Sequence, residues 1–218
     1  MPPLGPLDTP RFRGEIVIRR FLIVLSTLAL LGSAAPAYAD GYADIKAAIA
    51  ERANDQLDKA IQLLTRAITL GGLDKTALAT AYDLRGNAFD DKGDFERAAA
   101  DYDRAIRTKP DFAQAYNDRG IVRSDLGNFD AAIADYNHAL KLNPNSAQAY
   151  NNRGIAYHHK ADEGQAIADY TKAIALNPRY AHAYYNRAIA LHLRGDEAGA
   201  RKDYYKAIAL DPKLEKGP

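Results

Sequence analysis

The sequence predicts an all-α protein in which pairs of antiparallel helices follow one another and stack. Glycine recurs at a step of 34 residues, at Gly86, Gly120 and Gly154. Tyrosine keeps the same step in two columns, which are Tyr82, Tyr116, Tyr150 and Tyr184, and Tyr102, Tyr136, Tyr170 and Tyr204. Proline closes each interval, at Pro110, Pro144, Pro178 and Pro212. A fixed period of this length is typical of repeat proteins, in which each repeat is one supersecondary unit.

One interval, residues 147–180, illustrates the local physics. Residues 149–159 and 163–176 are two amphipathic stretches, and we expect helix A and helix B there. Tyr150, Gly154 and Tyr157 share one face of helix A, because they are spaced four and three residues apart. Pro178 ends helix B, since proline lacks the backbone donor that a helix needs. One helix pair cannot bury its own apolar face, so stacking on neighbouring units must do so.

Two alanine columns complete the pattern, namely Ala98, Ala132, Ala166 and Ala200, and Ala105, Ala139, Ala173 and Ala207. The order aromatic, Gly, aromatic, Ala, aromatic, Ala, Pro resembles the tetratricopeptide repeat (TPR) family. The resemblance covers residues 79–214 well and 41–78 loosely. It implies a right-handed TPR solenoid of antiparallel helix pairs whose helices A line a concave surface. It also implies a non-catalytic function, the binding of a protein or peptide partner in that groove.

Residues 1–39 have the features of a signal peptide. Arg19 and Arg20 precede the apolar run 21–31, and Ala37-Tyr38-Ala39 has the A-x-A form of a cleavage site before Asp40. We expect cleavage after Ala39, a periplasmic or secreted location and no membrane anchor in the mature protein. An uncleaved anchor is the alternative, although the run is short for a spanning helix of about 20 residues.

The remaining chain divides into five units and a tail. Residues 40–78 form a degenerate TPR-like helix pair, with Gly71 to Asp74 as an inserted loop. Four regular units follow at 79–112, 113–146, 147–180 and 181–214, and residues 215–218 are a tail. Glycine supplies the turn between the helices of three units, and the turn of the third unit, with Ala161 in place of glycine, is expected to differ slightly. No capping helix is expected after Pro212, so the last helix is a candidate homodimer contact.

Composition and charge argue against several classes of function. The 218-residue chain has a net charge of +1, which becomes −1 without residues 1–39, and such a near-neutral chain argues against nucleic-acid binding. The absence of cysteine excludes a disulfide framework and thiolate metal sites. No cofactor-binding motif is present, and we predict no cofactor. Counting Asp, Glu, Lys and Arg, the four regular units carry −2, −1, +1 and +2 in chain order. A partner of opposite polarity would be oriented along this gradient.

A charged pair recurs in every regular unit. Helix A carries Arg85, Arg119, Arg153 and Arg187, and helix B carries Asp101, Asp135, Asp169 and Asp203. We predict an ion pair between the two helices of each unit, because a buried guanidinium without a counter-charge would be very costly. A site for an anion formed by the four arginines is the alternative.

The resemblance assigns polar side chains of helix A to the partner-binding groove. They are Asp83, Asn87, Asn117, Asp118, Asn151, Asn152, Tyr185, Asn186, His158 and His192. An asparagine amide offers both a donor and an acceptor, so a row with one amide per unit can hold the backbone of an extended peptide.

The sequence also allows three functions other than partner binding in the groove. The row Asp90, Ser124, His158 and His192 contains catalytic residue types, but packed helices lie about 8–10 Å apart, whereas a nucleophile and its base need about 3 Å. We therefore predict no enzyme activity and no metal site. A small-ligand or metal binder that uses the His-rich, basic C-terminal half, and a self-assembling envelope component, stay as alternatives.

Overall fold

The computed structural model describes residues 36–216, and these residues form helices and connecting loops without a β-strand. The elements are α2 (Pro36–Ala53), α3 (Leu57–Leu70), α4 (Lys75–Asp91), α5 (Phe95–Thr108), α6 (Ala113–Asp125), α7 (Phe129–Leu142), α8 (Ala147–His159), α9 (Glu163–Leu176), α10 (Ala181–Leu193), α11 (Glu197–Leu210) and the short 3-10 helix η2 (Pro212–Lys216). The predicted all-α class is confirmed. Residues 1–35 of the predicted signal peptide lie outside the described residues. Helix α2 includes the predicted cleavage position after Ala39.

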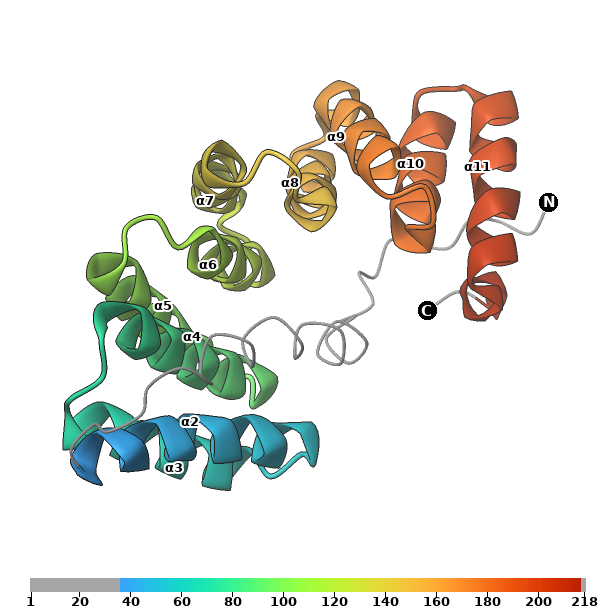
Figure 1. Cartoon of the computed structure of the whole chain (residues 1–218). Coiled ribbons are helices and arrows are strands. Elements are labelled where there is room, and N and C mark those ends of the chain that lie inside the picture. Colours follow the sequence, from blue (N-terminus) through green and yellow to red (C-terminus); the bar gives the residue numbers. More distant parts are fainter. Residues whose placement is uncertain (1–35, 217–218) are drawn as a thin grey trace. The chain divides into compact units, whose positions relative to one another are not determined.

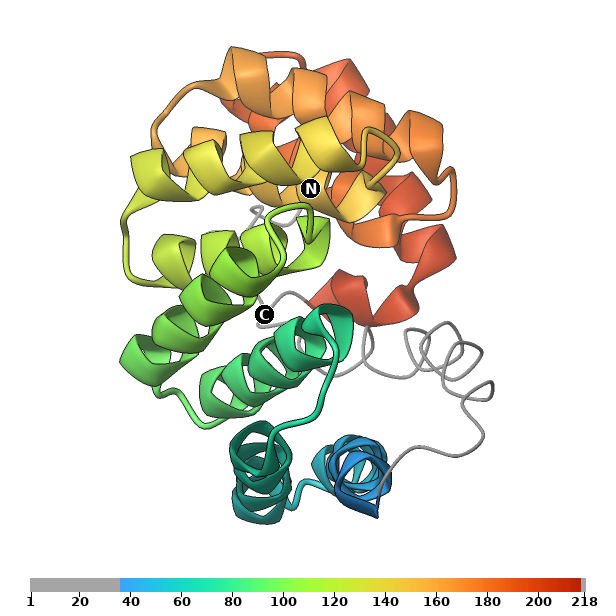
Figure 2. The ribbon, with the colours of Figure 1, turned by 60° about the vertical axis from the view of Figure 1, so that its left-hand side comes forward.

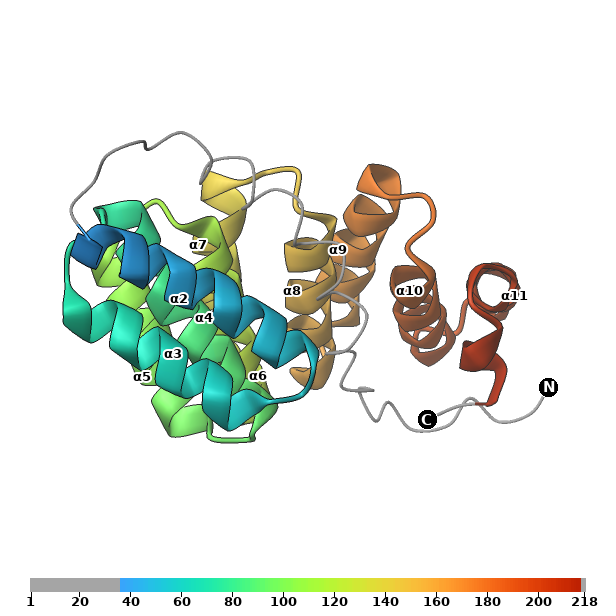
Figure 3. The same ribbon diagram turned by 60° about the horizontal axis from the view of Figure 1, so that its bottom comes forward.

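The chain divides into two compact bodies between Val122 and Arg123, within α6. In the first body α2 packs along α3, α3 packs on α4, and α4 packs along α5 (Figures 1 and 3). Ile45, Leu64 and Ala81 belong to one buried cluster that joins α2, α3 and α4. Each helix pair therefore covers the apolar face of the next, as a repeat array requires.

The second body repeats this arrangement from α7 to α11, the yellow to red helices of Figure 2. Helix α7 packs on α8, α8 along α9, α9 on α10, and α10 along α11. Tyr170 of α9 and Ala190 of α10 share one buried cluster, and Ala173 of α9 and Ala183 of α10 share another. Alanine on these faces lets the helix axes approach closely.

Tyrosines of helix B are packed directly against glycines of helix A. A Cβ atom at Gly86 would lie 2.8 Å from Cε1 of Tyr102, and one at Gly154 would lie 2.7 Å from Cε1 of Tyr170. Both tyrosines are among the largest fully buried side chains in the described part of the chain. At Gly86 and Gly154, glycine is therefore needed because a tyrosine ring lies where a Cβ atom would be.

The turn between helices A and B has the same hydrogen-bond pattern in the third and fourth units. Ala161 has a φ of 57° and Gly195 a φ of 81°, both in the left-handed region. In both turns the backbone nitrogen of the next residue donates across five residues, from Asp162 to Tyr157 and from Asp196 to Leu191, at 2.9 Å. Alanine thus adopts the left-handed conformation of the glycines with a φ of 57° against 76–81°, a slight difference as expected, at a steric cost of about 1–2 kcal/mol.

An unexpected short helix follows α11. It is a five-residue 3-10 helix rather than a full capping helix, and its Leu214 is buried in one cluster with Ala181, Tyr185 and Ile189. Leu214 lies one repeat after Tyr180, at the start of what would be the next helix A. One leucine thus covers part of the apolar surface that a further unit would cover.

Among the described residues, none of the helices is both long enough and apolar enough to span a bilayer.

Candidate functional site

Arginine of helix A and aspartate of helix B meet within three of the regular units. Arg85 donates from Nε to Asp101 (2.6 Å) and from Nη2 to the second oxygen (2.9 Å). The same two-bond contact joins Arg153 to Asp169 at 2.8 and 2.7 Å. It joins Arg187 to Asp203 at 2.6 and 3.0 Å. In the second unit Arg119 bonds Asp103, and Asp135 accepts from Arg123 at 2.9 Å.

The arginines of the repeating column also contact helix B of the preceding unit. The Nη1 atom of Arg85 donates to Thr65 (3.0 Å). The same atom of Arg153 donates to Asn137, and that of Arg187 donates to Thr171 (3.0 Å). Each guanidinium also lies over the tyrosine ring three residues earlier, at 5.5 to 5.8 Å from the centroid. The arginines thus connect helices within and between units. This arrangement does not support the alternative of an anion site made of four free arginines.

The predicted groove residues of the first body are largely engaged with one another. Asp83, Asn117 and Asp118 are buried. Asn117 donates to Asp118 (3.1 Å), and Asn87 donates to Asp83 (3.4 Å) while accepting from the hydroxyl of Tyr102 (3.0 Å). Burial, and then nearby carboxylates, raise the pKa of Tyr102 well above its ordinary value, so this hydroxyl stays protonated and donates. This body therefore offers a partner little of the predicted row.

The groove residues of the second body are more accessible. Asn151 and Tyr185 are buried, whereas Asn152 and Asn186 are partly exposed. The amide of Asn186 donates to the side-chain oxygen of Asn151 at 3.1 Å, which joins helices A of adjacent units. Helices α8 and α10 also contact each other directly. One amide bond therefore joins Asn151 and Asn186 of successive units, and Asn152 and Asn186 are the partly exposed asparagines of this face.

The two predicted groove histidines pair with glutamates of helix B, a contact that the sequence pattern did not predict. Nδ1 of His158 lies 2.8 Å from Glu163, and Nδ1 of His192 lies 2.8 Å from Glu197. The partners are five residues apart across the A-to-B turn, and the recurrence of His and Glu at the 34-residue step is the signal that could have revealed them. In the described part of the chain, no group of three or more His, Asp or Glu side chains is arranged to hold a metal ion.

His159 points to a different environment from His158. Its ring stacks on Phe129 with 4.8 Å between centroids. Desolvation, and then the neighbouring His158, lower the pKa of His159 below its ordinary value. His159 therefore serves as a neutral packing side chain at neutral pH.

Comparison with protein families and solved structures agrees with the repeat pattern. Three family models, each described as tetratricopeptide repeat, match residues 88–153, 147–180 and 169–202. A crystal structure of MamA is 24% identical over 78% of this chain and 96% of its own, with a TM-score of 0.66. MamA from Desulfovibrio magneticus RS-1 is 18% identical over 81% and 97%, with a TM-score of 0.69. YrrB, described as a TPR protein with an unusual peptide-binding site, is 23% identical over 79% and 87%, with a TM-score of 0.61. No curated protein sequence matches the chain.

Proposed function

The chain belongs to the tetratricopeptide repeat family, and we propose that it is a non-catalytic adaptor that holds an extended segment of another protein. The observation that carries the proposal is the amide bond from Asn186 of α10 to Asn151 of α8, beside the partly exposed Asn152. An extended peptide exposes a backbone donor and acceptor at every residue, and amides are the side chains that can bond both. The peptide-binding site described for YrrB is consistent with this use of the fold.

The second body supplies the direct contacts in this proposal. Asn152 and Asn186 contact the peptide backbone, and the buried Asn151 holds Asn186 in position through the 3.1 Å bond. The partner is a protein segment, and neither a nucleic acid nor a cofactor takes part. In the first body the groove residues are buried and have a structural role rather than contacts with the partner. They are Asp83, Asn117 and Asp118.

The test is selection of binding peptides from a random library on the chain 40–218, followed by titration of a selected peptide. Replacing Asn152 by alanine is expected to weaken binding about tenfold, which corresponds to the loss of a contact worth about 1.4 kcal/mol. Asn186→Ala is expected to weaken binding and also to cost about 1 kcal/mol of stability, because the bond to Asn151 is lost.

Asn145→Ala is the matched control, since Asn145 is an exposed asparagine in the loop before α8. Equal affinities for the wild type, Asn152→Ala and Asn145→Ala would contradict the proposal. Heat released only on titration with divalent metal ions, without peptide binding, would favour the small-ligand or metal alternative.

We also propose that the adaptor works outside the cytoplasm, in the periplasm or as a secreted protein. Arg19-Arg20, the apolar run 21–31 and the Ala37-Tyr38-Ala39 site support export. The intact mass of protein purified from the envelope fraction of its source cells is expected to correspond to a chain that begins at Asp40. A membrane-bound form that retains residues 1–39 would contradict cleavage.

A further inference from the structure

An open pocket of about 680 Å³ lies between α10 and α11, on surface that the proposed groove does not use. Arg187 and Asp203 lie in its lining, joined by the two-bond ion pair of the fourth unit. Tyr184 and Tyr205 contribute aromatic lining, and Lys202 and Lys206 contribute two ammonium groups. The pocket therefore combines aromatic surface with an excess of positive charge.

The pocket residues depart from the repeat at two positions. Lys202 occupies the position of Ala100, Ala134 and Ala168, and Tyr205 occupies the position of Asp103, Asn137 and Thr171. Within the chain, only the fourth unit therefore places a lysine and a tyrosine at these two positions. The rest of helix B keeps the family pattern, so the fold itself does not require these two side chains.

The lysines carry charge that no described neighbour neutralises in an ion pair. Lys202 and Lys206 are exposed and four residues apart on one helix, a like-charge spacing that destabilises an isolated helix. Neither occurs among the ion pairs of the described residues, whereas the only carboxylate of the pocket, Asp203, is held by Arg187. A negatively charged ligand would relieve this repulsion.

Tyr205 is exposed to 63%, an unusual position for a large aromatic side chain. Its ring contacts that of Tyr204 edge to face, at 5.8 Å between centroids. An exposed tyrosine is typical of protein-binding surfaces, where Tyr is enriched.

We propose that this pocket is a second binding site, which takes an acidic peptide segment that carries one apolar side chain. Carboxylates of the segment lie against Lys202 and Lys206, and the apolar side chain packs against Tyr205. The net charge of +2 on the fourth unit, the most positive of the four, favours an acidic occupant over a second copy of the basic unit itself.

The test uses a fluorescein-labelled peptide of six glutamates around one central leucine, and its counterpart with six lysines, in fluorescence anisotropy with the chain 40–218. The acidic peptide is expected to bind and the basic peptide is not. Lys202→Ala and Tyr205→Thr restore residues that occur in the preceding unit, so both variants are expected to fold. The double variant is expected to bind the acidic peptide at least tenfold more weakly, and binding by the wild type is expected to weaken as salt is raised.

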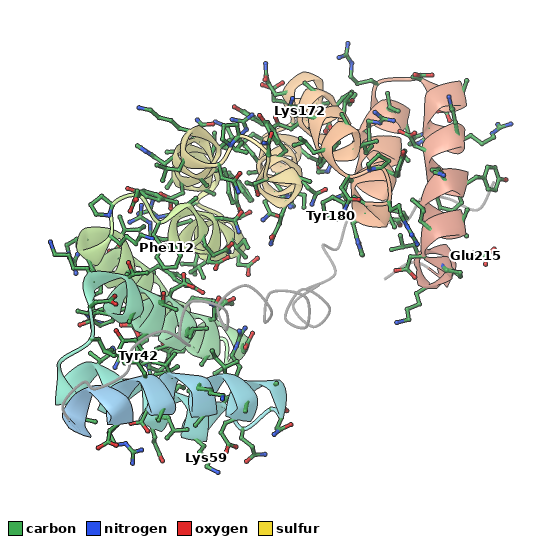
Figure 4. The ribbon with its side chains drawn as sticks, in the orientation of Figure 1. Tyr42, Lys59, Phe112, Lys172, Tyr180 and Glu215 are labelled. Atoms are coloured by element: carbon green, nitrogen blue, oxygen red, sulfur yellow. The ribbon has the colours of Figure 1, made fainter. Side chains whose placement is uncertain are left out.

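Lys172→Ala is the matched control, because Lys172, labelled on α9 in Figure 4, is exposed at the position of Lys206 in the preceding unit. Asn152→Ala is expected to leave the acidic peptide bound, so that failure of this site and failure of the groove can be told apart. Absence of binding, or equal binding by the double variant, would overturn the proposal. Wild-type self-association in sedimentation velocity that the double variant loses, without peptide binding, would identify a second copy as the occupant and would equally overturn it.

Discussion

Replacing Arg153 by methionine is expected to lower the free energy of unfolding by about 3–5 kcal/mol, the cost of leaving a buried charge without its partner. The side chain of Asp169 is only 7% exposed, and its two oxygens accept from Arg153. Methionine keeps the apolar stem but supplies no cation. Urea unfolding followed by circular dichroism measures the loss.

Two variants separate this cause from lost packing. In Arg85→Met the buried Asp101 keeps a second cation, since Arg104 also donates to it at 2.6 Å. The loss there is expected to be clearly smaller than for Arg153→Met. Combining Arg153→Met with Asp169→Asn removes the buried charge and is expected to recover part of the stability. Equal losses in Arg85→Met and Arg153→Met would show that the ion pair is not the cause.

Replacing Gly154 by leucine is expected to cost about 2–3 kcal/mol through overpacking. Even a Cβ atom at this position would lie 2.7 Å from Cε1 and 2.9 Å from Cδ1 of Tyr170. The ring cannot move aside freely, because Tyr170 is packed among Ala166, Ala190 and their neighbours. Chemical denaturation of the two proteins gives the difference.

Alanine at two glycine positions provides an internal comparison. Gly154→Ala is expected to destabilise, despite the higher helix propensity of alanine. Gly164→Ala makes the same chemical change in α9, where the nearest atoms to a new Cβ are 3.6 Å away, and is expected to stabilise by about 0.5–1 kcal/mol. A stabilised Gly154→Ala would refute the close approach of Tyr170.

The fold could be predicted because each repeated residue type has a definite structural effect, such as packing a helix face or ending a helix. Predicted helix B at 163–176 coincides with α9, and predicted helix A at 149–159 begins two residues late relative to α8. Pro178 and the left-handed turn residue limit the choice of boundary on either side. The Arg and Asp columns were recognisable as a contact because their separation of 16 residues never changes.

The site was harder to predict because periodicity identifies a helix face but not how deeply each side chain on it lies. The repeat pattern placed three polar side chains on the groove face and so predicted that a partner could reach them. The structure shows that all three are buried, namely Asp83, Asn117 and Asn151. Their polar atoms bond to neighbours that a one-dimensional pattern does not bring together, such as Asn186 to Asn151. The His158–Glu163 contact crosses a turn whose geometry depends on one left-handed residue, Ala161.

The arginine that joins three successive helices gives the array a mechanical property. Arg153 holds α7 through Asn137 and α9 through Asp169, and Arg187 holds α9 and α11 in the same way. Loss of one guanidinium loosens two neighbours at once, so fraying of a single helix pair is transmitted to the next. We therefore expect the stability of each helix pair to depend on that of its neighbours.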